Sequence, residues 1–295
     1  MLPDYSEPVY RPPSEANSLI LQVTNGCSWN RCSFCEMYTD SHKKFRPKPI
    51  EDIRRELEWL QGQSLSPRRI FLADGDAMTL SIRRLVEILS AIREHFPDVQ
   101  RVSAYCLPRN VKAKSVEELE QLRQLGLSLV YVGCESGDDE LLGLIEKGET
   151  WQSSMHALHK LQLAGIKRSV MILNGLGGQR YSEQHATHSA TLMNETQPEY
   201  LATLVVTFPL GRERFEHSLK GNFKALDPIQ LAREMEILLS NLQLEKTIFR
   251  SDHASNYLVL KGTLNKDRDR LLQIVRQSIQ QPGSVALRPE WQRGL

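Results

Sequence analysis

Three of the five cysteines of the chain lie within nine residues, in the stretch TNGCSWNRCSFCEMY at 24–38. Cys27, Cys32 and Cys35 are spaced C-x4-C-x2-C and directly follow an apolar run. Clustered thiolates bind soft metals, so the two candidates are a zinc ion and an iron–sulfur cluster. A structural zinc site needs four ligands, and His42 is a candidate for the fourth. An iron–sulfur cube held by three cysteines keeps one iron open to another molecule.

The two remaining cysteines lie inside apolar runs and are interpreted as small buried core residues. These are Cys106 and Cys134. The alternative, that one of them is a fourth cluster ligand, stays open. No second cysteine cluster is present in the sequence, so we expect no auxiliary cluster.

Composition places the chain among ordinary globular proteins. It has 295 residues, 40% hydrophobic and 25% charged, with a net charge of +1. The near-zero charge gives no general basic field, so we do not expect a nucleic-acid partner, although a local basic patch stays open. The first residues lack the pattern of a signal peptide, and no apolar run has membrane-spanning length. We therefore expect a cytoplasmic protein without membrane contact, in which clustered thiols bind metal more often than they form disulfides.

Six short apolar runs alternate with amphipathic stretches along most of the chain. Such short, nearly continuous runs are typical of strands buried on both faces. The predicted strands are 18–24, 68–74, 101–107, 128–134, 168–174 and 200–207. The predicted helices are 50–61, 80–96, 115–126, 138–148, 151–165 and 181–195. The third helix carries a capping-box pattern, with Ser115 as the cap and Glu118 three residues later.

Six β–α repeats predict a parallel sheet with helices outside, either doubly wound or arranged as a barrel. Polar residues follow every predicted strand, and in a β/α barrel all these ends open onto one mouth. One large site at the strand ends is therefore the favoured interpretation, although loops are polar in any case. After 212 the pattern changes to a helix at 228–242, a strand and loop at 245–260, and a last helix at 266–279. We expect the tail from 280 onward to be loosely ordered.

The cysteine loop in this setting resembles the radical S-adenosylmethionine (radical SAM) superfamily. The resemblance rests on a strand, then three cysteines, with Phe34 just before the last of them. The stretch YVGCESGDDELLGLIEKGET at 131–150 is similar to the branch that contains oxygen-independent coproporphyrinogen dehydrogenases, methylthiotransferases and the Elongator catalytic subunit. Two departures stand out: the family usually has C-x3-C-x2-C, and ADGDA at 73–77 replaces a Gly-Gly-Glu stretch.

The resemblance covers roughly residues 18–212 and implies a partial (β/α)6 TIM-type barrel. It divides the chain into an extended N-terminal segment (1–17), the radical SAM core (18–212) and a small, mainly helical C-terminal extension (213–295). Only about seventeen residues precede the first strand, so we expect no cobalamin-binding domain in this chain.

Family membership would imply a [4Fe-4S] cluster held by Cys27, Cys32 and Cys35. Its open iron would be chelated by the amino and carboxylate groups of S-adenosyl-L-methionine (SAM). Reductive cleavage of SAM would give a 5′-deoxyadenosyl radical that abstracts hydrogen from an unidentified substrate. Implied partners are an electron donor such as flavodoxin or ferredoxin, and a substrate that is a small molecule or an exposed group of a larger one.

The resemblance also implies which side chains contact SAM at the strand ends. The implied set is Phe34, Tyr38, Asp74, Gly75, Asp76, Arg109, Glu135, Ser136 and Asn174. Phe34 is expected near the adenine, and the Asp74–Asp76 turn at the methionine ammonium. For Asp76 the alternative is a helix N-cap.

Three further assignments follow from position along the family's barrel. Glu135 and Ser136 are expected at the ribose hydroxyls or the amino group. Arg109 and the basic run at 42–49 are candidates for the methionine carboxylate or an anionic substrate, with a solvated loop as the alternative for the run. Asn174 begins NGLGGQR, which is similar to the family's glycine-bearing fifth strand.

A late polar cluster, FRSDHASNY at 249–257, supplies the candidate catalytic residues. Arg250, His253 and Asn256 could contact substrate or donate protons. A turn with local side-chain capping is the equal alternative.

Two competing functions remain open from the sequence. One is a non-catalytic haem- or SAM-binding relative, with His253 or His42 as an axial ligand. The other is a zinc-clipped structural protein. Trp29, in the cysteine loop, either lines a substrate cavity or braces the loop.

Overall fold

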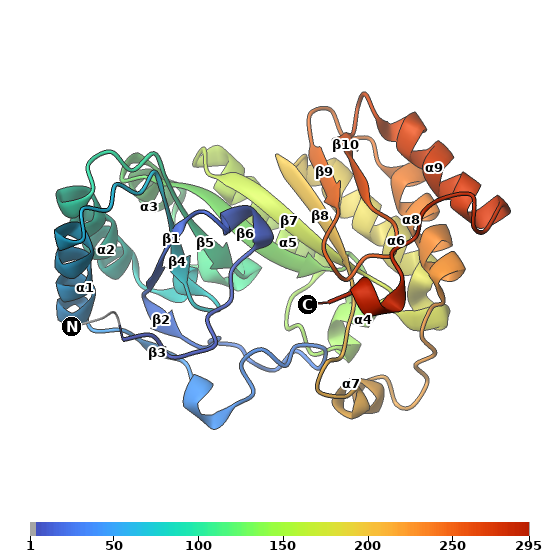
Figure 1. The fold of residues 1–295 in the computed structure, drawn as a ribbon, viewed down its shortest axis with the longest axis horizontal. Helices are drawn as coiled ribbons and strands as arrows, with labels where there is room; N and C mark the ends of the chain where they lie inside the picture. The colour runs from blue at the N-terminus through green and yellow to red at the C-terminus, as the bar shows by residue number, and fades with distance from the viewer. Residues whose placement is uncertain (1–3, 295) are drawn as a thin grey trace. The chain divides into compact units, whose positions relative to one another are not determined.

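The computed structural model describes residues 4–294 and divides them into two compact units. Among the described residues, the first unit comprises 4–30, 37–133 and 157–168. The second comprises 31–36, 134–156 and 169–294. Each unit has its own parallel strands and outer helices (Figure 1).

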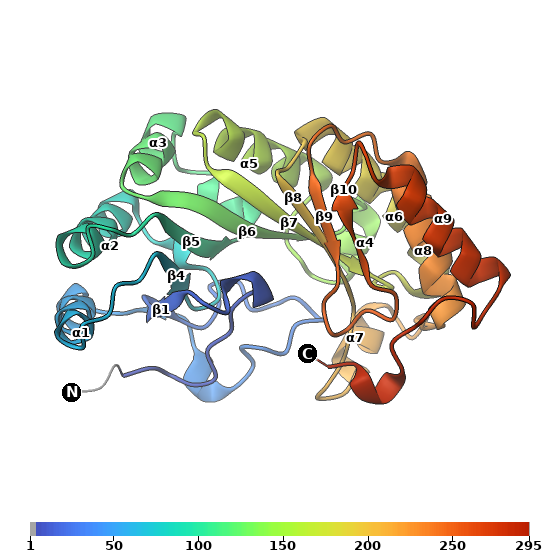
Figure 2. The same ribbon diagram turned by 45° about the horizontal axis from the view of Figure 1, so that its top comes forward.

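The first unit carries four parallel strands in the order β1-β4-β5-β6. These strands are β1 (Leu19–Gln22), β4 (Arg69–Ala73), β5 (Arg101–Cys106) and β6 (Leu127–Glu135), which ends in the second unit. Helices α1 (Ile50–Gly62), α2 (Ile82–His95) and α3 (Val116–Gln124) follow them along one side (Figure 2). Helix α3 begins at the predicted cap, where Ser115 and Glu118 form both hydrogen bonds of a capping box.

Short elements complete the first unit. They are the 3-10 helices η1 (Pro13–Glu15), η2 (Ser41–Lys43), η3 (Ala77–Thr79) and η4 (Pro108–Val111), and the strands β2 (Thr24–Asn25) and β3 (Arg46–Pro47). The predicted run 18–24 splits at Val23, because Thr24 and Asn25 leave the main sheet and pair antiparallel with β3. This small ribbon holds both ends of the segment that carries the cysteines.

The N-terminal segment is fixed by a buried carboxylate. Glu15 is fully buried and accepts hydrogen bonds from Tyr131 Oη at 2.6 Å and Arg101 Nη2 at 2.8 Å. A buried carboxylate needs such partners, because desolvation without compensation is costly. The segment predicted to be extended therefore ends in a 3-10 turn anchored to β5 and β6.

The second unit carries strands in the order β7-β8-β9-β10. They are β7 (Lys167–Asn174), β8 (Tyr200–Val205), β9 (Ile248–Ser251) and β10 (Leu260–Thr263). The first three are parallel, and β10 returns antiparallel to β9. The helices are α4 (Asp139–Leu144), α5 (Trp151–Leu163, shared with the first unit), α6 (Gly178–Thr196), α7 (Glu213–Ser218), α8 (Pro228–Asn241) and α9 (Arg268–Gln280), with the 3-10 turn η5 (Glu290–Gln292).

The predicted α/β class is confirmed, and all six predicted β–α repeats are present as β1 and β4–β8 with their helices. The sequence understated the strand content after residue 212, since β9 extends the parallel strands and β10 adds a hairpin. Helices α6, α8 and α9 pack in succession beside these strands (Figure 1). The domain boundaries drawn from the sequence stay a prediction. None of the helices within residues 4–294 is long and apolar enough to span a membrane.

The described part of the C-terminal tail is tied to the β9–β10 loop, a contact that the expectation of a loose tail did not foresee. Arg288 Nη1 donates to three carbonyls of the β9–β10 loop, those of His253, Ala254 and Asn256, at 2.6–3.2 Å. Its backbone N–H donates to Tyr257 O at 2.7 Å. A single guanidinium with several donors can tie a tail to a loop in this way.

We predict that Arg288→Ala lowers the free energy of unfolding by about 1–3 kcal/mol, because three carbonyls lose a charged donor. Chemical denaturation of the full chain measures this. Arg276→Ala is the matched control, since Arg276 makes only a half-exposed ion pair with Glu236 and should cost under about 1 kcal/mol. Equal losses in both variants would contradict the anchoring role of Arg288.

Candidate functional site

The cysteine loop is built into the first unit at its beginning. Gly26 precedes Cys27 with φ +69°, and a Cβ there would lie 2.0 Å from Lys43 O, so only glycine fits. Asn25 Nδ2 donates to the carbonyls of His42 and Lys44 at 2.7 and 3.1 Å. These contacts close the loop segment at its base. His42, the candidate zinc ligand, is exposed and lies 2.9 Å from Glu7 O through Nε2.

Asp74, at the end of β4, is fully committed to partners within the first unit. Its Oδ2 forms a buried ion pair with Lys43 Nζ at 2.8 Å, and its Oδ1 accepts from Tyr38 Oη at 3.0 Å. Asp74 and Lys43 are almost completely buried. Tyr38 and Asp74, both predicted SAM contacts, therefore fix the segment after the cysteines to the end of β4.

Asp76 ties the residue after Cys27 to the same strand end. Its carboxylate accepts from both the backbone N–H, at 3.1 Å, and the hydroxyl of Ser28. It makes no side-chain cap on η3, so the N-cap alternative does not describe it. Burial raises the pKa of Asp76, although hydrogen bonds from Ser28 and Asn110 lower it in part. Between the two carboxylates, Gly75 leaves room for Tyr38 and the Gly26 carbonyl, which a Cβ would meet at 2.8–2.9 Å.

Arg109 and Trp29 form a stacked pair in the first unit. The guanidinium carbon lies 3.7 Å from the centroid of the Trp29 ring. A cation at this distance from an indole face is attracted by the ring quadrupole. Trp29 therefore braces the cysteine loop against the residues after β5. Arg109 also contributes its charge to Asp76.

The other two loop cysteines lie in the second unit, where a turn brings their residues together. The backbone N–H of Cys35 donates to Cys32 O at 3.1 Å. Helix α7 holds this turn from outside, since Arg214 donates to Cys35 O at 3.2 Å and to Arg31 O at 3.0 Å. Ser218 Oγ adds a hydrogen bond to Ser33 Oγ at 2.8 Å.

Lys147 is a functional candidate that sequence reasoning missed. It is 3% exposed and donates to Glu135 Oε1 at 3.1 Å. Burial alone would lower its pKa, but the charges of Glu135 and Cys32 outweigh burial and raise it, so Lys147 stays a cation. Its Nζ lies 5.8 Å from the Phe34 ring centroid. A fixed cation beside a cysteine favours the thiolate, which is the form that binds metal.

Glu135 is the last residue of strand β6 and Ser136 follows it, at the predicted strand end. The two residues have different hydrogen-bond partners. Glu135 has a left-handed backbone, φ +65°, a costly conformation for this residue type that recurs at functional sites. Ser136 is fully buried, and its Oγ lies 2.8 Å from His185 Nδ1. Phe34 packs at the edge of an apolar cluster that includes Leu142 and Phe215.

The remaining predicted residues lie around β7 and β9 of the second unit. Asn174 is 3% exposed, and its Oδ1 has no hydrogen-bond partner among residues 4–294. Asn256 is fully engaged, donating to Thr203 O at 2.8 Å and accepting from Val205 N at 2.8 Å. Arg250 is exposed and bonds the Phe249 carbonyl at 3.0 Å.

His253 takes part in a local turn. Its Nδ1 lies 2.9 Å from Ser255 Oγ, and burial together with Arg288 lowers its pKa. Both His253 and Asn256 thus have hydrogen-bond partners among the described residues. This arrangement agrees with the alternative of a turn capped by local side chains.

Cys106 and Cys134 lie in the core of the strands, as the sequence suggested. Both are buried, and burial raises the pKa of Cys134 to about 12. Within residues 4–294, no three His, Cys, Asp or Glu side chains are grouped to hold a metal ion. The loop thiols are divided between the units, with Cys27 in the first and Cys32 and Cys35 in the second.

The sequence profile of the Radical SAM superfamily matches residues 21–189. The chain belongs to the radical SAM superfamily. The match begins in β1 and ends in α6. It includes the cysteine loop and the buried carboxylates Asp74, Asp76 and Glu135.

Two curated relatives illustrate the likeness. An uncharacterized methyltransferase of Pyrococcus horikoshii is 23% identical over 203 residues, which are 69% of this chain and 42% of the relative. The heme chaperone HemW of Bacillus subtilis is 22% identical over 223 residues, 71% of this chain and 58% of the relative. The chain thus spans about half of the length of these relatives.

Among solved structures, the coproporphyrinogen III oxidase of Escherichia coli, described as a radical SAM enzyme, superposes with a TM-score of 0.56. The identity is 15%, over 76% of this chain and 51% of that one, so the likeness shows a shared fold.

A buried hydrogen-bonded group in the second unit contains two titratable side chains, Glu234 and His185. Glu234 accepts from Gly175 N and Ser182 Oγ, both at 2.6 Å, and its Oε1 lies 4.0 Å from His185 Nε2. Burial raises the pKa of Glu234 to about 7 and lowers that of His185 to about 4. Both groups are therefore neutral in the folded protein at mildly acidic pH.

The two shifts have opposite effects on stability. Because the folded-state pKa of Glu234 is raised, its contribution is full below pH 4.5 and is lost as pH rises through about 7. His185 has a lowered pKa, so its contribution is gained as pH rises from about 4 to 6.5. The dependence of wild-type stability on pH is therefore the sum of these two opposite contributions.

We predict that Glu234→Gln gains stability relative to wild type as pH rises from 4.5 to about 7, by at most about 3 kcal/mol. Denaturant unfolding at several pH values measures the difference. Glu236→Gln, at a half-buried position on the same helix, is measured alongside as the control. A pH-independent difference for Glu234→Gln would contradict the raised pKa.

Proposed function

We propose that the protein is a radical SAM enzyme in which Cys27, Cys32 and Cys35 hold a [4Fe-4S] cluster. The observation that carries this proposal is the C-x4-C-x2-C loop directly after the first parallel strand, within the region that matches the superfamily. The chemistry of the donor set fits: three thiols on one loop, a buried cation beside Cys32, and two cysteines only half-buried. Soft thiolates of this kind are the usual ligands of iron–sulfur clusters.

When bound, the cluster would supply an electron for cleavage of SAM to methionine and a 5′-deoxyadenosyl radical, which abstracts hydrogen from a substrate. The chain's own residues hold the loop and the strand ends for this chemistry. Asp76 holds Ser28, next to Cys27, and Arg214 holds the backbone of Cys35. Fixed geometry of this kind lowers the cost of bringing reactants together.

The contacts within each unit narrow the proposed SAM-binding set. Asp74 forms an ion pair with Lys43 and accepts a hydrogen bond from Tyr38. We therefore assign Asp74 and Tyr38 to positioning the loop. The other predicted residues remain the proposed SAM contacts: Phe34, Gly75, Asp76, Arg109, Glu135, Ser136 and Asn174. An external donor such as flavodoxin or ferredoxin is the proposed source of the electron.

Replacing each loop cysteine tests the proposal. We predict that Cys27→Ala, Cys32→Ala and Cys35→Ala lose the cluster's visible absorption and EPR signal after anaerobic reconstitution, and form no 5′-deoxyadenosine from SAM and a reductant. Cys106→Ala, which changes a buried core thiol, is the control and should keep both. An intact cluster in Cys32→Ala, or a colourless wild-type protein that binds zinc, would overturn the proposal.

Lys147 gives a second test, of its charge rather than of the ligands. We predict that Lys147→Gln lowers the midpoint potential of the cluster, because removing a nearby positive charge disfavours the added electron. An EPR-monitored redox titration measures the shift, and Lys147→Arg should restore the wild-type potential.

The double variant Lys147→Gln with Glu135→Gln removes the ion pair without a net change of charge. Its potential should lie closer to wild type than that of Lys147→Gln alone. An unchanged potential in Lys147→Gln would show that the lysine is only structural.

A haem-binding function is the second candidate, because the heme chaperone HemW matches 71% of the chain. Titration of the purified protein with haem, followed by its absorption, separates the two. Stoichiometric haem binding that is lost in His253→Ala, with no 5′-deoxyadenosine from SAM, would favour haem carriage.

A further inference from the structure

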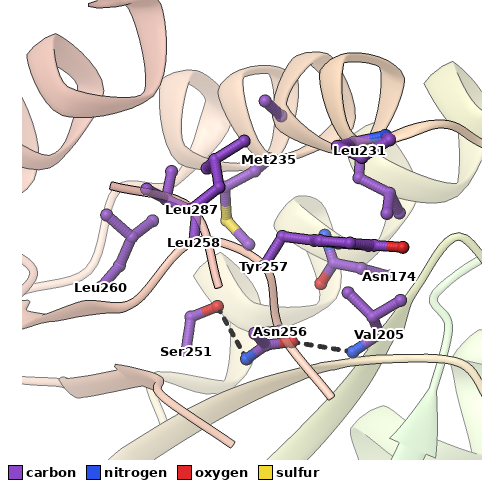
Figure 3. A pocket seen from close by; sticks show the side chains of 12 residues that line it. Asn174, Val205, Leu231, Met235, Ser251, Asn256, Tyr257, Leu258, Leu260 and Leu287 are labelled. Atoms are coloured by element: carbon purple, nitrogen blue, oxygen red, sulfur yellow. Dashed lines mark hydrogen bonds between the residues drawn. The ribbon is translucent and has the colours of Figure 1, made fainter. Parts of the chain in front are cut away.

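A small pocket lies in the second unit between helix α8 and the carboxyl ends of β7, β8 and β9 (Figure 3). Asn174 and Val205 contribute from the strands, and Leu231 and Met235 from the helix. Tyr257, in the β9–β10 loop, lies across the pocket in the close-up view (Figure 3).

The pocket lies on the face of β7 that is turned toward helix α8. Leu173 lies on the opposite face of this strand. Along β7, Val170, Ile172 and Asn174 are 0–3% exposed and alternate with half-buried residues. Because side chains on a strand alternate between faces, Asn174 shares the face of Ile172. Leu173, on the opposite face, packs with the apolar cluster that contains Phe34. The pocket therefore lies on the opposite face of β7 from the apolar cluster that contains Phe34.

Asn174 lines this pocket and carries an unsatisfied hydrogen-bond acceptor. Its Oδ1 is buried and has no partner among the described residues, and the residue as a whole is 3% exposed. An unmade hydrogen bond at a buried carbonyl carries a desolvation penalty of about 1–3 kcal/mol. Such a group calls for an explanation, and a bound donor would remove the penalty.

The neighbouring polar groups do not compete for this acceptor. Asn256 accepts from Val205 N at 2.8 Å and donates to Ser251 Oγ at 3.1 Å. None of the described lining residues is charged, and most are aliphatic. The lining therefore suits a neutral, mainly apolar ligand with one donor.

The C-terminal tail forms one wall of the pocket. Leu287 lines it directly, and Tyr257 is held by tail residues on both its hydroxyl and its ring. Tyr257 Oη donates to Glu290 Oε2 at 2.7 Å, and the Arg293 guanidinium lies 3.8 Å from the ring centroid. Because the hydroxyl is taken, Tyr257 offers its ring rather than a hydrogen bond to an occupant.

We infer that this pocket binds the end of a small, neutral, apolar molecule that donates one N–H or O–H hydrogen bond to Asn174 Oδ1. A phenol is the simplest member of this class. The cavity volume of about 30 Å³ exceeds the roughly 10–15 Å³ that one water needs. The pocket therefore has room for the donor group of such a molecule.

A matched pair of probes tests the hydrogen bond. 4-Fluorophenol and 4-fluorotoluene differ in the donor and little in size, and ¹⁹F NMR of each with the full chain reports binding directly. We expect the phenol to bind about tenfold or more tightly than the toluene. Asn174→Leu should bind both equally. Asn265→Leu, the same exchange at an exposed turn, should keep the preference.

The readout needs neither the cluster nor SAM, so it stands apart from the proposed catalysis. Thermal unfolding checks that Asn174→Leu is folded. Equal binding of both probes to wild type, no binding of the phenol, or a retained preference in Asn174→Leu would each overturn the inference and assign the cavity to water.

Discussion

A buried carboxylate at the end of a parallel strand needs a cation, and this constraint organises both units. In the first, Asp74 ends β4 and pairs with Lys43 at 2.8 Å. In the second, Glu135 ends β6 and pairs with Lys147 at 3.1 Å. All four side chains are mostly withdrawn from water, where removing one partner typically costs about 3–5 kcal/mol. Lys43 ends the 3-10 helix η2 and Lys147 lies in the loop after α4, so each of these segments must hold one conformation to keep its ion pair.

Much of the fold could be predicted because its signals are local. The capping box of Ser115 and Glu118 and the six apolar runs are visible in the printed sequence. The lysines could not be found this way, because a buried lysine looks like a surface lysine until its strand-end partner is known. The tail contact was missed for a related reason: Arg288 binds backbone carbonyls, which leave no signature in the residues they belong to.

The strand-end residues show where the candidate site could and could not be foreseen. The family resemblance placed Asn174 among the SAM contacts, which stays a prediction, and the structure adds that its side chain shares a face of β7 with Ile172. The two-residue period of a strand carries that distinction, and applying it would have separated Asn174 from Leu173. For Asp74, no local pattern shows that both oxygens already have partners, since Tyr38 and Lys43 lie more than thirty residues away in sequence.

Residues beyond the family match also support the cysteine turn. The match ends at 189, yet Arg214 and Ser218 on α7 hold the backbone of Cys35 and the side chain of Ser33. A turn that must keep two thiols at a fixed spacing loses entropy when ordered, and these hydrogen bonds offset part of that loss. The same region then adds β9 to the parallel strands. The C-terminal part of the chain is thus a structural component of the loop and the strands rather than an appendage to a finished core.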